Sequence, residues 1–200
     1  MHNKQKTEDK HRNVIAYAVT GLFLLPILII GGLHYIVKND TALDDIDSFY
    51  VQNQTSKVIE TKYFNIILNR IPLRAEVYDP ENSDLNYTIG LDISTDKLNF
   101  GTIPPNTPAR KQLKMANDRN GPVKIIIEPQ GNISKYISIE SNNIILEPQM
   151  KKDIIVDFVG SEIKGFFEGE LYVKIIVPPE DAYNQNIFKS IFYDLMIRLA

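Results

Sequence analysis

The feature that most constrains this chain is an uninterrupted apolar run near its start. Residues Val14 to Val37 read VIAYAVTGLFLLPILIIGGLHYIV and contain no Asp, Glu, Lys or Arg. As an α-helix this run would extend roughly 36 Å at about 1.5 Å per residue, which exceeds the roughly 30 Å hydrocarbon core of a bilayer. A buried helix of a soluble protein is usually shorter and keeps a polar stripe. The run therefore predicts a transmembrane helix over residues 14–37.

The residues on either side of this run predict how the helix is oriented. A cleaved signal peptide would have a shorter apolar region, and no small-x-small cleavage site precedes Lys38, so we expect an uncleaved signal-anchor. After Lys38 no Lys or Arg occurs until Lys57. Basic residues before the span are Lys4, Lys6, Lys10 and Arg12. The positive-inside rule then makes residues 1–13 a cytoplasmic tail of a single-pass cell-membrane protein, with the C-terminal domain extracytoplasmic.

Composition excludes several classes of protein. The chain has 200 residues with 22 basic and 25 acidic side chains, a formal net charge of −3, so nothing favours binding to nucleic acid. It has no cysteine, which excludes disulfides, thiolate metal sites and cysteine nucleophiles. The hydrophobic content of 44% is enough for a packed core, and one folded domain is expected outside the membrane.

Residues 38–84 give the weakest pattern in the chain, and we expect a juxtamembrane linker with possible accessory strands. Several Asp residues follow Lys38; their spacing does not match the EF-hand loop, so a solvated acidic linker is favoured over a calcium site. The stretch VIETKYFNIILNRIPLRAEVYDP is apolar enough to be ordered as strand and turn, with breaks at Pro72 and Pro80. It could add an edge element to the main domain.

Residues 85–178 alternate between apolar and polar side chains, the period-2 pattern of half-buried strands. About seven strands are expected from Tyr87 to Val177, with turn signals roughly every ten residues and a hairpin loop at Asn117–Gly121. This spacing is typical of an antiparallel β-sandwich, an all-β fold. Inward-facing sets are Tyr87, Ile89, Leu91 and Ile93; Leu113 and Met115; Val123, Ile125 and Ile127; Ile154, Val156 and Phe158; and Leu171, Val173, Ile175 and Val177.

This part of the chain resembles a family of immunoglobulin-like modules. The stretches LDISTDKLNFGTIPPNTPARKQLKMANDRNGPVKI, ISIESNNIILEPQMKKDIIVDF and GFFEGELYVKI look like the ASPM-SPD-2-Hydin and major sperm protein modules, and like the NEW3 domains of prokaryotic surface proteins. The usual Glu-Pro-Gly-Glu of these modules stands as Glu-Pro-Gln-Met at Glu147–Met150. The resemblance implies an immunoglobulin-like β-sandwich with a non-catalytic adhesion, scaffold or assembly role, and it carries over no binding residue.

No constellation of residues predicts an enzyme. The three histidines are His2, His11 and His34, all within the tail or the apolar run, so the exterior domain lacks a His for a triad or a zinc site. Glu168 and Glu170 are two residues apart and could serve glycoside hydrolysis only inside a cleft, so a solvated strand face is favoured. We expect no catalytic residue, metal, cofactor or small-molecule substrate.

Residues 179–200 change period and predict an amphipathic helix. The cap is expected at Asn184 or Asn186. One broad apolar face is expected, and it is the candidate contact surface of the protein: Ile187, Phe188, Ile191, Phe192, Leu195, Met196 and Leu199. It could pack on its own sandwich, dock in a partner's groove or lie on the outer membrane leaflet.

Taken together, these patterns predict a membrane-anchored, non-catalytic interaction or assembly protein of the cell envelope, with an envelope protein as its partner. Two alternatives remain open. A ligand-binding receptor or enzyme would need a site formed only in the fold, such as a deep pocket lined by carboxylates. A chaperone for surface fibres would need an open sheet edge.

Overall fold

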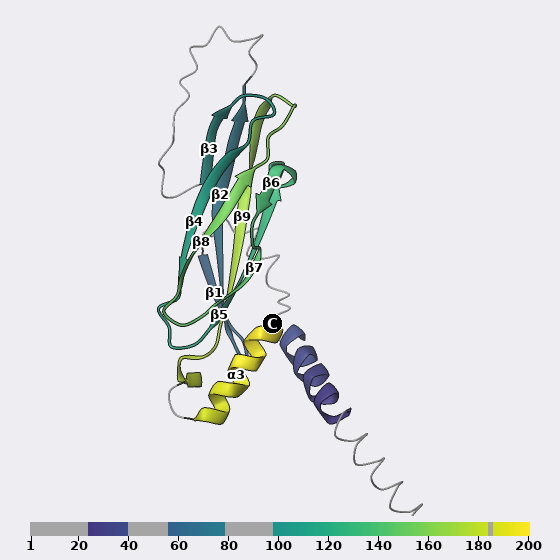
Figure 1. The fold of residues 1–200 in the computed structure, drawn as a ribbon, viewed down its shortest axis with the longest axis vertical. Helices are drawn as coiled ribbons and strands as arrows, with labels where there is room; N and C mark the ends of the chain where they lie inside the picture. Colours follow the sequence, from purple (N-terminus) through teal and green to yellow (C-terminus); the bar gives the residue numbers. More distant parts are fainter. Residues whose placement is uncertain (1–23, 40–55, 79–97, 184–185) are drawn as a thin grey trace, which may run out of the picture.

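A computed structural model describes residues 24–39, 56–78, 98–183 and 186–200. About half of the described residues lie in β-strands, which are arranged as two sheets (Figure 1). The larger sheet has the order β1 (Ser56–Glu60), β2 (Asn65–Val77), β9 (Gly165–Val177), β5 (Val123–Gly131) and β7 (Asn143–Leu146), and β3 (Leu98–Ile103) also pairs with β2. The smaller sheet has the order β4 (Ala109–Ala116), β8 (Lys151–Phe158) and β6 (Ile137–Ile139).

The core lies between the two sheets, as the period-2 alternation predicted. The inward-facing sets of β5, β8 and β9 contribute to one cluster of apolar side chains, with Leu113 and Met115 of β4 packed against it. Phe158 is fully buried and its ring lies 5.9 Å from that of Phe100 and 6.0 Å from that of Phe167. The predicted strand at Tyr87–Ile93 lies outside the described residues.

Strand β2 is more central than the sequence indicated. Its 13 residues pair with all 13 residues of β9, while β1 and β3 pair with its two halves on the other side. Pro72 lies between these halves. Among the described strands, β9 alone pairs with β2 at this residue, so the missing N–H of Pro72 interrupts no second ladder there. The segment expected as a possible edge element is therefore an internal strand of the larger sheet.

The β2–β3 pair departs from the expected antiparallel sandwich, because its strands run parallel, whereas all the other pairs are antiparallel among the described residues. Parallel neighbours need a long connection, which residues 78–97 supply. Its register shifts between Arg74 and Glu76. On β3, opposite this shift, Gly101 has φ 80°, a left-handed conformation that favours glycine, and its N–H donates to Asn99 Oδ1 at 3.0 Å.

The segment Asn117–Gly121 is not a hairpin loop, because β4 and β5 belong to different sheets. It is a crossover held by the buried side chain of Asn117. Its Nδ2 donates to the carbonyls of Gly121 and Leu146, both at 2.9 Å, and to that of Glu147 at 3.1 Å. The turn-forming residues of this segment are compatible with either a hairpin or a crossover. The hydrogen bonds from the Asn117 amide to Leu146 and Glu147 stabilise the crossover.

Two helices extend from one end of the sandwich, which we call the helical end (Figure 1). One is formed by residues 24–39, and the other is α3 (Ile187–Leu199), which follows the short 3-10 helix η2 (Glu180–Tyr183). In the described parts of the chain, neither helix combines the length and apolar content required to cross a bilayer. Residues 14–23 of the predicted span lie outside the described residues.

Candidate functional site: the outward face of α3

Helix α3 begins where the sequence predicted. Asn186 is its N-cap, in extended conformation, and its side-chain Oδ1 accepts a hydrogen bond from the backbone N–H of Phe188 at 2.9 Å. At the other end the N–H of Ala200 donates to the carbonyl of Met196. The helix is thus closed at both ends by local hydrogen bonds.

The structure divides the apolar residues of α3 between two faces. Tyr193, Met196 and Ile197 are buried against the sandwich. The prediction of a single apolar face is wrong for Met196, which belongs to this buried set, and Leu199 is half-buried. We call the remaining five exposed residues the outward face of α3: Ile187, Phe188, Ile191, Phe192 and Leu195.

The outward face is the most exposed apolar surface of the helix. Phe188 is 79% exposed, Ile187 72% and Ile191 60%. At about 100° per residue, these positions and Leu195 cluster within roughly 100° of arc around the helix. The buried stripe at Tyr193, Met196 and Ile197 lies on the opposite side. An i, i+3, i+4 spacing of apolar residues in the sequence was the signal for this second stripe.

The buried stripe packs on a second apolar cluster at the helical end. This cluster covers the side of the larger sheet that faces away from the sandwich core, through Phe64, Ile66 and Ile176. The ring of Tyr193 meets that of Phe64 edge-on at 6.3 Å. Val37, at the end of helix 24–39, is fully buried in the same cluster. Helix 24–39 and α3 therefore share one attachment to the sheet.

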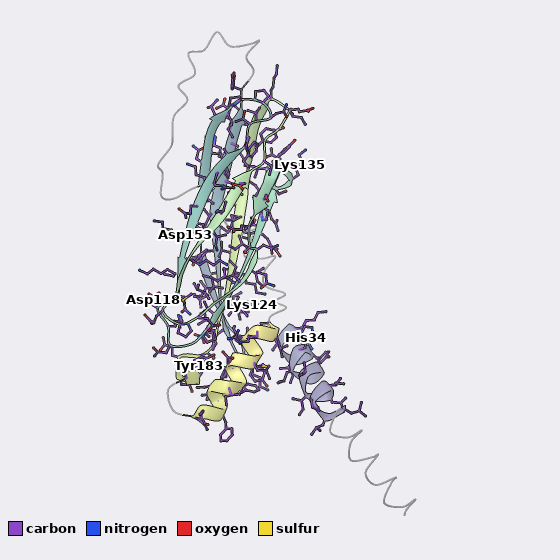
Figure 2. All side chains as sticks on the ribbon, in the orientation of Figure 1. His34, Asp118, Lys124, Lys135, Asp153 and Tyr183 are labelled. Atoms are coloured by element: carbon purple, nitrogen blue, oxygen red, sulfur yellow. The ribbon has the colours of Figure 1, made fainter. Side chains whose placement is uncertain are left out.

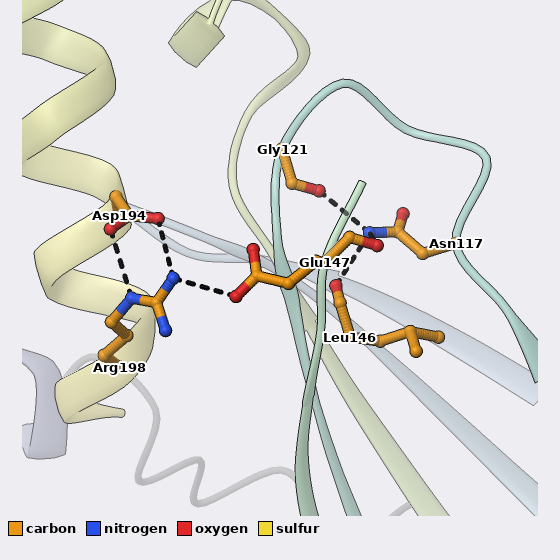
Figure 3. A network of polar contacts seen from close by, with 6 residues as sticks. All are labelled: Asn117, Gly121, Leu146, Glu147, Asp194 and Arg198. Carbon is orange, nitrogen blue, oxygen red and sulfur yellow. Dashed lines mark hydrogen bonds and ion pairs between the residues drawn. The ribbon is translucent and has the colours of Figure 1, made fainter. Parts of the chain in front are cut away.

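An ion-pair network fixes the C-terminal end of α3 against the sandwich (Figure 3). Arg198 Nη2 donates to Glu147 Oε1 at 2.9 Å, and Arg198 Nε donates to Asp194 Oδ2 at 3.1 Å. Glu147 in turn is held through its backbone carbonyl by Asn117. The crossover loop, the end of β7 and the helix are thereby connected through three side chains.

The cations of α3 are both engaged by carboxylates. Lys189 pairs with Asp181 of η2, and hydrogen bonding from this ammonium group lowers the pKa of Asp181. Arg198 pairs with Asp194 and Glu147. These pairs contain two cations and three carboxylates, so the outward face is not bordered by a cationic patch.

Helix 24–39 is apolar on every side. Ile27, Leu28, Ile29 and Ile30 are consecutive, so they point about 100° apart around the axis, and each is roughly half-exposed or more. Leu33 is half-buried and Val37 is fully buried, so contact with the sandwich begins close to the end of the helix. Nothing else in the described chain covers the helix before that point.

The carboxylates considered from the sequence have structural partners. Glu170 forms a bidentate pair with Arg70, with Arg70 Nε to Glu170 Oε2 at 2.8 Å, and it accepts from the hydroxyl of Tyr172 at 2.8 Å. Glu168 lies 3.7 Å from Arg74 and is largely exposed. Both carboxylates therefore face arginines on the outer face of the larger sheet.

A small hollow of about 240 Å³ lies between the crossover loop and η2 and includes Arg119, Gly121, Pro179 and Tyr183 among its lining residues. The ring of Tyr183 lies so close to Gly121 that an added Cβ there would be 2.0 Å from it, which explains the glycine. The Tyr183 hydroxyl is buried without a hydrogen-bond partner, and desolvation by burial raises the pKa of Tyr183 to about 12.

Among the described residues, no three His, Asp or Glu side chains lie together in a group that could hold a metal ion. His34 lies on helix 24–39, outside the sandwich that carries Asp118 and Asp153 (Figure 2). Lys124 is buried on the outer face of the larger sheet, and desolvation lowers its pKa. Comparisons of the chain with models of protein families, with curated proteins and with solved structures give no match.

Proposed function

We propose that this protein is a single-pass membrane protein whose immunoglobulin-like sandwich stands outside the cytoplasm and acts as a non-catalytic interaction or assembly component of the cell envelope. The observation that carries the proposal is helix 24–39, which is apolar on all sides and continues the apolar run of residues 14–23. A helix that is hydrophobic all round is stable when protein or lipid surrounds it. An apolar run as long as residues 14–37 has the length of a helix that spans the hydrocarbon core of a bilayer, so lipid is the environment we propose for it.

The resemblance to immunoglobulin-like modules gains support from one backbone position. Gln149 has φ 59°, a left-handed conformation that favours glycine, and it occupies the place of the Gly in the usual Glu-Pro-Gly-Glu of these modules. Its Nε2 donates to the carbonyl of Asp118 at 2.7 Å, which offsets part of the conformational cost. A left-handed conformation at the position where these modules have Gly is consistent with a distant relationship to them.

Cysteine labelling tests the topology, because the chain has no cysteine of its own. We expect Ser138→Cys, on the exposed surface of β6, to react with a membrane-impermeant maleimide in intact cells or spheroplasts. The matched variant Asn3→Cys should react only after lysis. The opposite labelling pattern would show that the orientation is inverted, and labelling of neither variant before lysis would contradict an extracytoplasmic domain.

The interaction role is tested by affinity purification of the full chain from detergent-solubilised membranes. We expect a stoichiometric envelope protein to co-purify with the wild-type chain at endogenous expression. Recovery of the chain alone after mild crosslinking of intact cells would contradict an assembly role and leave the topology proposal standing.

A further inference from the structure

We infer that the outward face of α3 lies on the outer surface of the bilayer that holds residues 14–37, with its apolar side chains among the lipid headgroups and the upper acyl chains. The inference rests on the proposed membrane anchor and adds a second membrane contact, made by the other end of the chain. An amphipathic helix of this kind lies in the interface plane and buries its apolar face in the boundary between headgroups and acyl chains.

The two helices share one attachment to the larger sheet. Val37 is fully buried in the cluster that also holds Met196 and Ile197, so the end of the predicted span and the C-terminal half of α3 touch the same part of the sheet. Figure 1 shows both helices extending from this end, away from the strands. Where helix 24–39 leaves the sandwich for lipid, α3 is therefore at the level of the membrane surface.

The exposed surface of helix 24–39 suits lipid better than a protein groove. A groove covers one face of a helix, whereas Ile27 to Ile30 are exposed in all directions around helix 24–39. Such a helix needs apolar surroundings on every side, and for an apolar run as long as residues 14–37 those surroundings are the lipid of a bilayer. The exposed residues of α3 lie at the same end of the molecule, so the same lipid can cover Ile187, Phe188 and Ile191 without a further protein.

Aromatic residues on and between the two helices lie where the membrane–water interface is expected. Tyr35 is 69% exposed near the end of helix 24–39. The ring of Tyr63 lies 6.4 Å from that of Phe192, and Lys62 Nζ lies 5.1 Å from the centre of the Tyr63 ring. Tyrosines and lysines of this kind are typical of the headgroup region, where a ring is half in hydrocarbon and a charge stays in water.

The charges around α3 determine which lipids the contact requires. Lys189 and Arg198 are both paired with carboxylates, so little net positive charge is left to attract anionic headgroups. The contact is therefore hydrophobic, and it should be as strong on phosphatidylcholine as on a membrane containing phosphatidylglycerol. It should also be unaffected by salt, which screens only electrostatic attraction.

The absence of tryptophan from the chain allows a direct test. The full-length variant Phe188→Trp is reconstituted at low protein density into phosphatidylcholine vesicles that contain nitroxide-labelled phosphatidylcholine. Because Phe188 is 79% exposed, the larger ring needs no repacking. Phe166→Trp is the matched control, since Phe166 is also an exposed aromatic but lies at the far end of β9. Leu28→Trp reports on the anchor itself.

We expect lipid nitroxide to quench the tryptophans at positions 28 and 188 several-fold more strongly than the one at 166, with emission at position 188 shifted to shorter wavelength. Quenching at 28 without quenching at 188 would overturn the inference and leave the anchor standing. Quenching at neither position would overturn both. A tryptophan at 188 that is shielded from aqueous acrylamide yet not quenched by lipid would show that a second copy or another protein covers α3, which also overturns the inference.

Discussion

The position of α3 makes the substitution Met196→Ala the most informative perturbation of the helical end. Met196 is fully buried in the cluster that joins α3, helix 24–39 and the larger sheet. Replacing a buried Met with Ala typically costs 2–5 kcal/mol, and the cost is smallest where the surroundings can collapse into the cavity. Because α3 is a single helix on the surface of a sheet, we expect a loss of about 2–3 kcal/mol in the free energy of unfolding, from the lower part of that range.

Thermal unfolding of the full chain in a mild detergent, followed by far-UV circular dichroism, measures this loss. For a chain of this size, 1 kcal/mol corresponds to about 2–4 °C in melting temperature, so Met196→Ala should melt roughly 5–10 °C lower. The matched control is Phe188→Ala on the same helix. Phe188 is 79% exposed, and its truncation should leave the melting temperature within about 2 °C, since surface substitutions usually stay within ±0.5 kcal/mol.

The two variants together test the assignment of faces on α3. If Met196→Ala melts like the wild type while Phe188→Ala melts several degrees lower, the helix is rotated and the wrong stripe has been placed on the sheet. If neither substitution changes the melting temperature, α3 contributes nothing to the stability of the domain.

Three further predictions concern the polar groups. Asn117→Ala removes an amide that donates hydrogen bonds to three carbonyls, so it should lower the free energy of unfolding by about 2–3 kcal/mol in urea denaturation. An unchanged midpoint would show that Asn117 does not hold the crossover. Glu170→Ala leaves the guanidinium of Arg70, which is 10% exposed, without its carboxylate and should lower the free energy of unfolding by about 3 kcal/mol. The double variant Arg70→Met, Glu170→Leu should recover most of this loss. If the single variant is as stable as the wild type, Arg70 and Glu170 do not form a buried pair. The unfolded chain releases the Tyr183 proton near the ordinary pKa of 10.0 and the folded chain only near 12, so this group makes folding less favourable as pH rises from about 10 to 12. Tyr183→Phe should therefore show a smaller loss of stability over that interval in an alkaline denaturation series, and identical curves for the two proteins would refute the assignment.

The alternation of side chains made the strands predictable, because a strand with one buried face keeps a period of two regardless of its partners. Ile154, Val156 and Phe158 face the core for this reason, and so do Leu171 and Val173. Pairing was not predictable in the same way. The parallel β2–β3 pair depends on contacts between segments separated by residues 78–97, and nothing local in either strand specifies its neighbour.

The faces of α3 show a similar limit. Apolar residues at nearly every turn position predict a helix, and the cap at Asn186 is local, so both could be expected from the sequence. The sheet covers one apolar stripe of α3 through residues such as Phe64 and Ile66. These residues lie in the part of the chain where the alternation of apolar and polar residues is weakest, so the covered stripe could not be identified from the sequence. Met196 therefore lies on the covered face, although the helical pattern alone groups it with the exposed residues.

The full-length pairing of β2 with β9 has a consequence for the reach of the domain. Both strands have 13 residues, and at about 3.3 Å per residue they form a stiff ribbon roughly 43 Å long. One end of this ribbon bears the cluster that holds helix 24–39 and α3. Under the proposed membrane contacts, a domain held at both of these helices would not swing like one on a single tether. Val77 and Gly165, paired at the other end of the ribbon, would then stay at a nearly constant height above the bilayer.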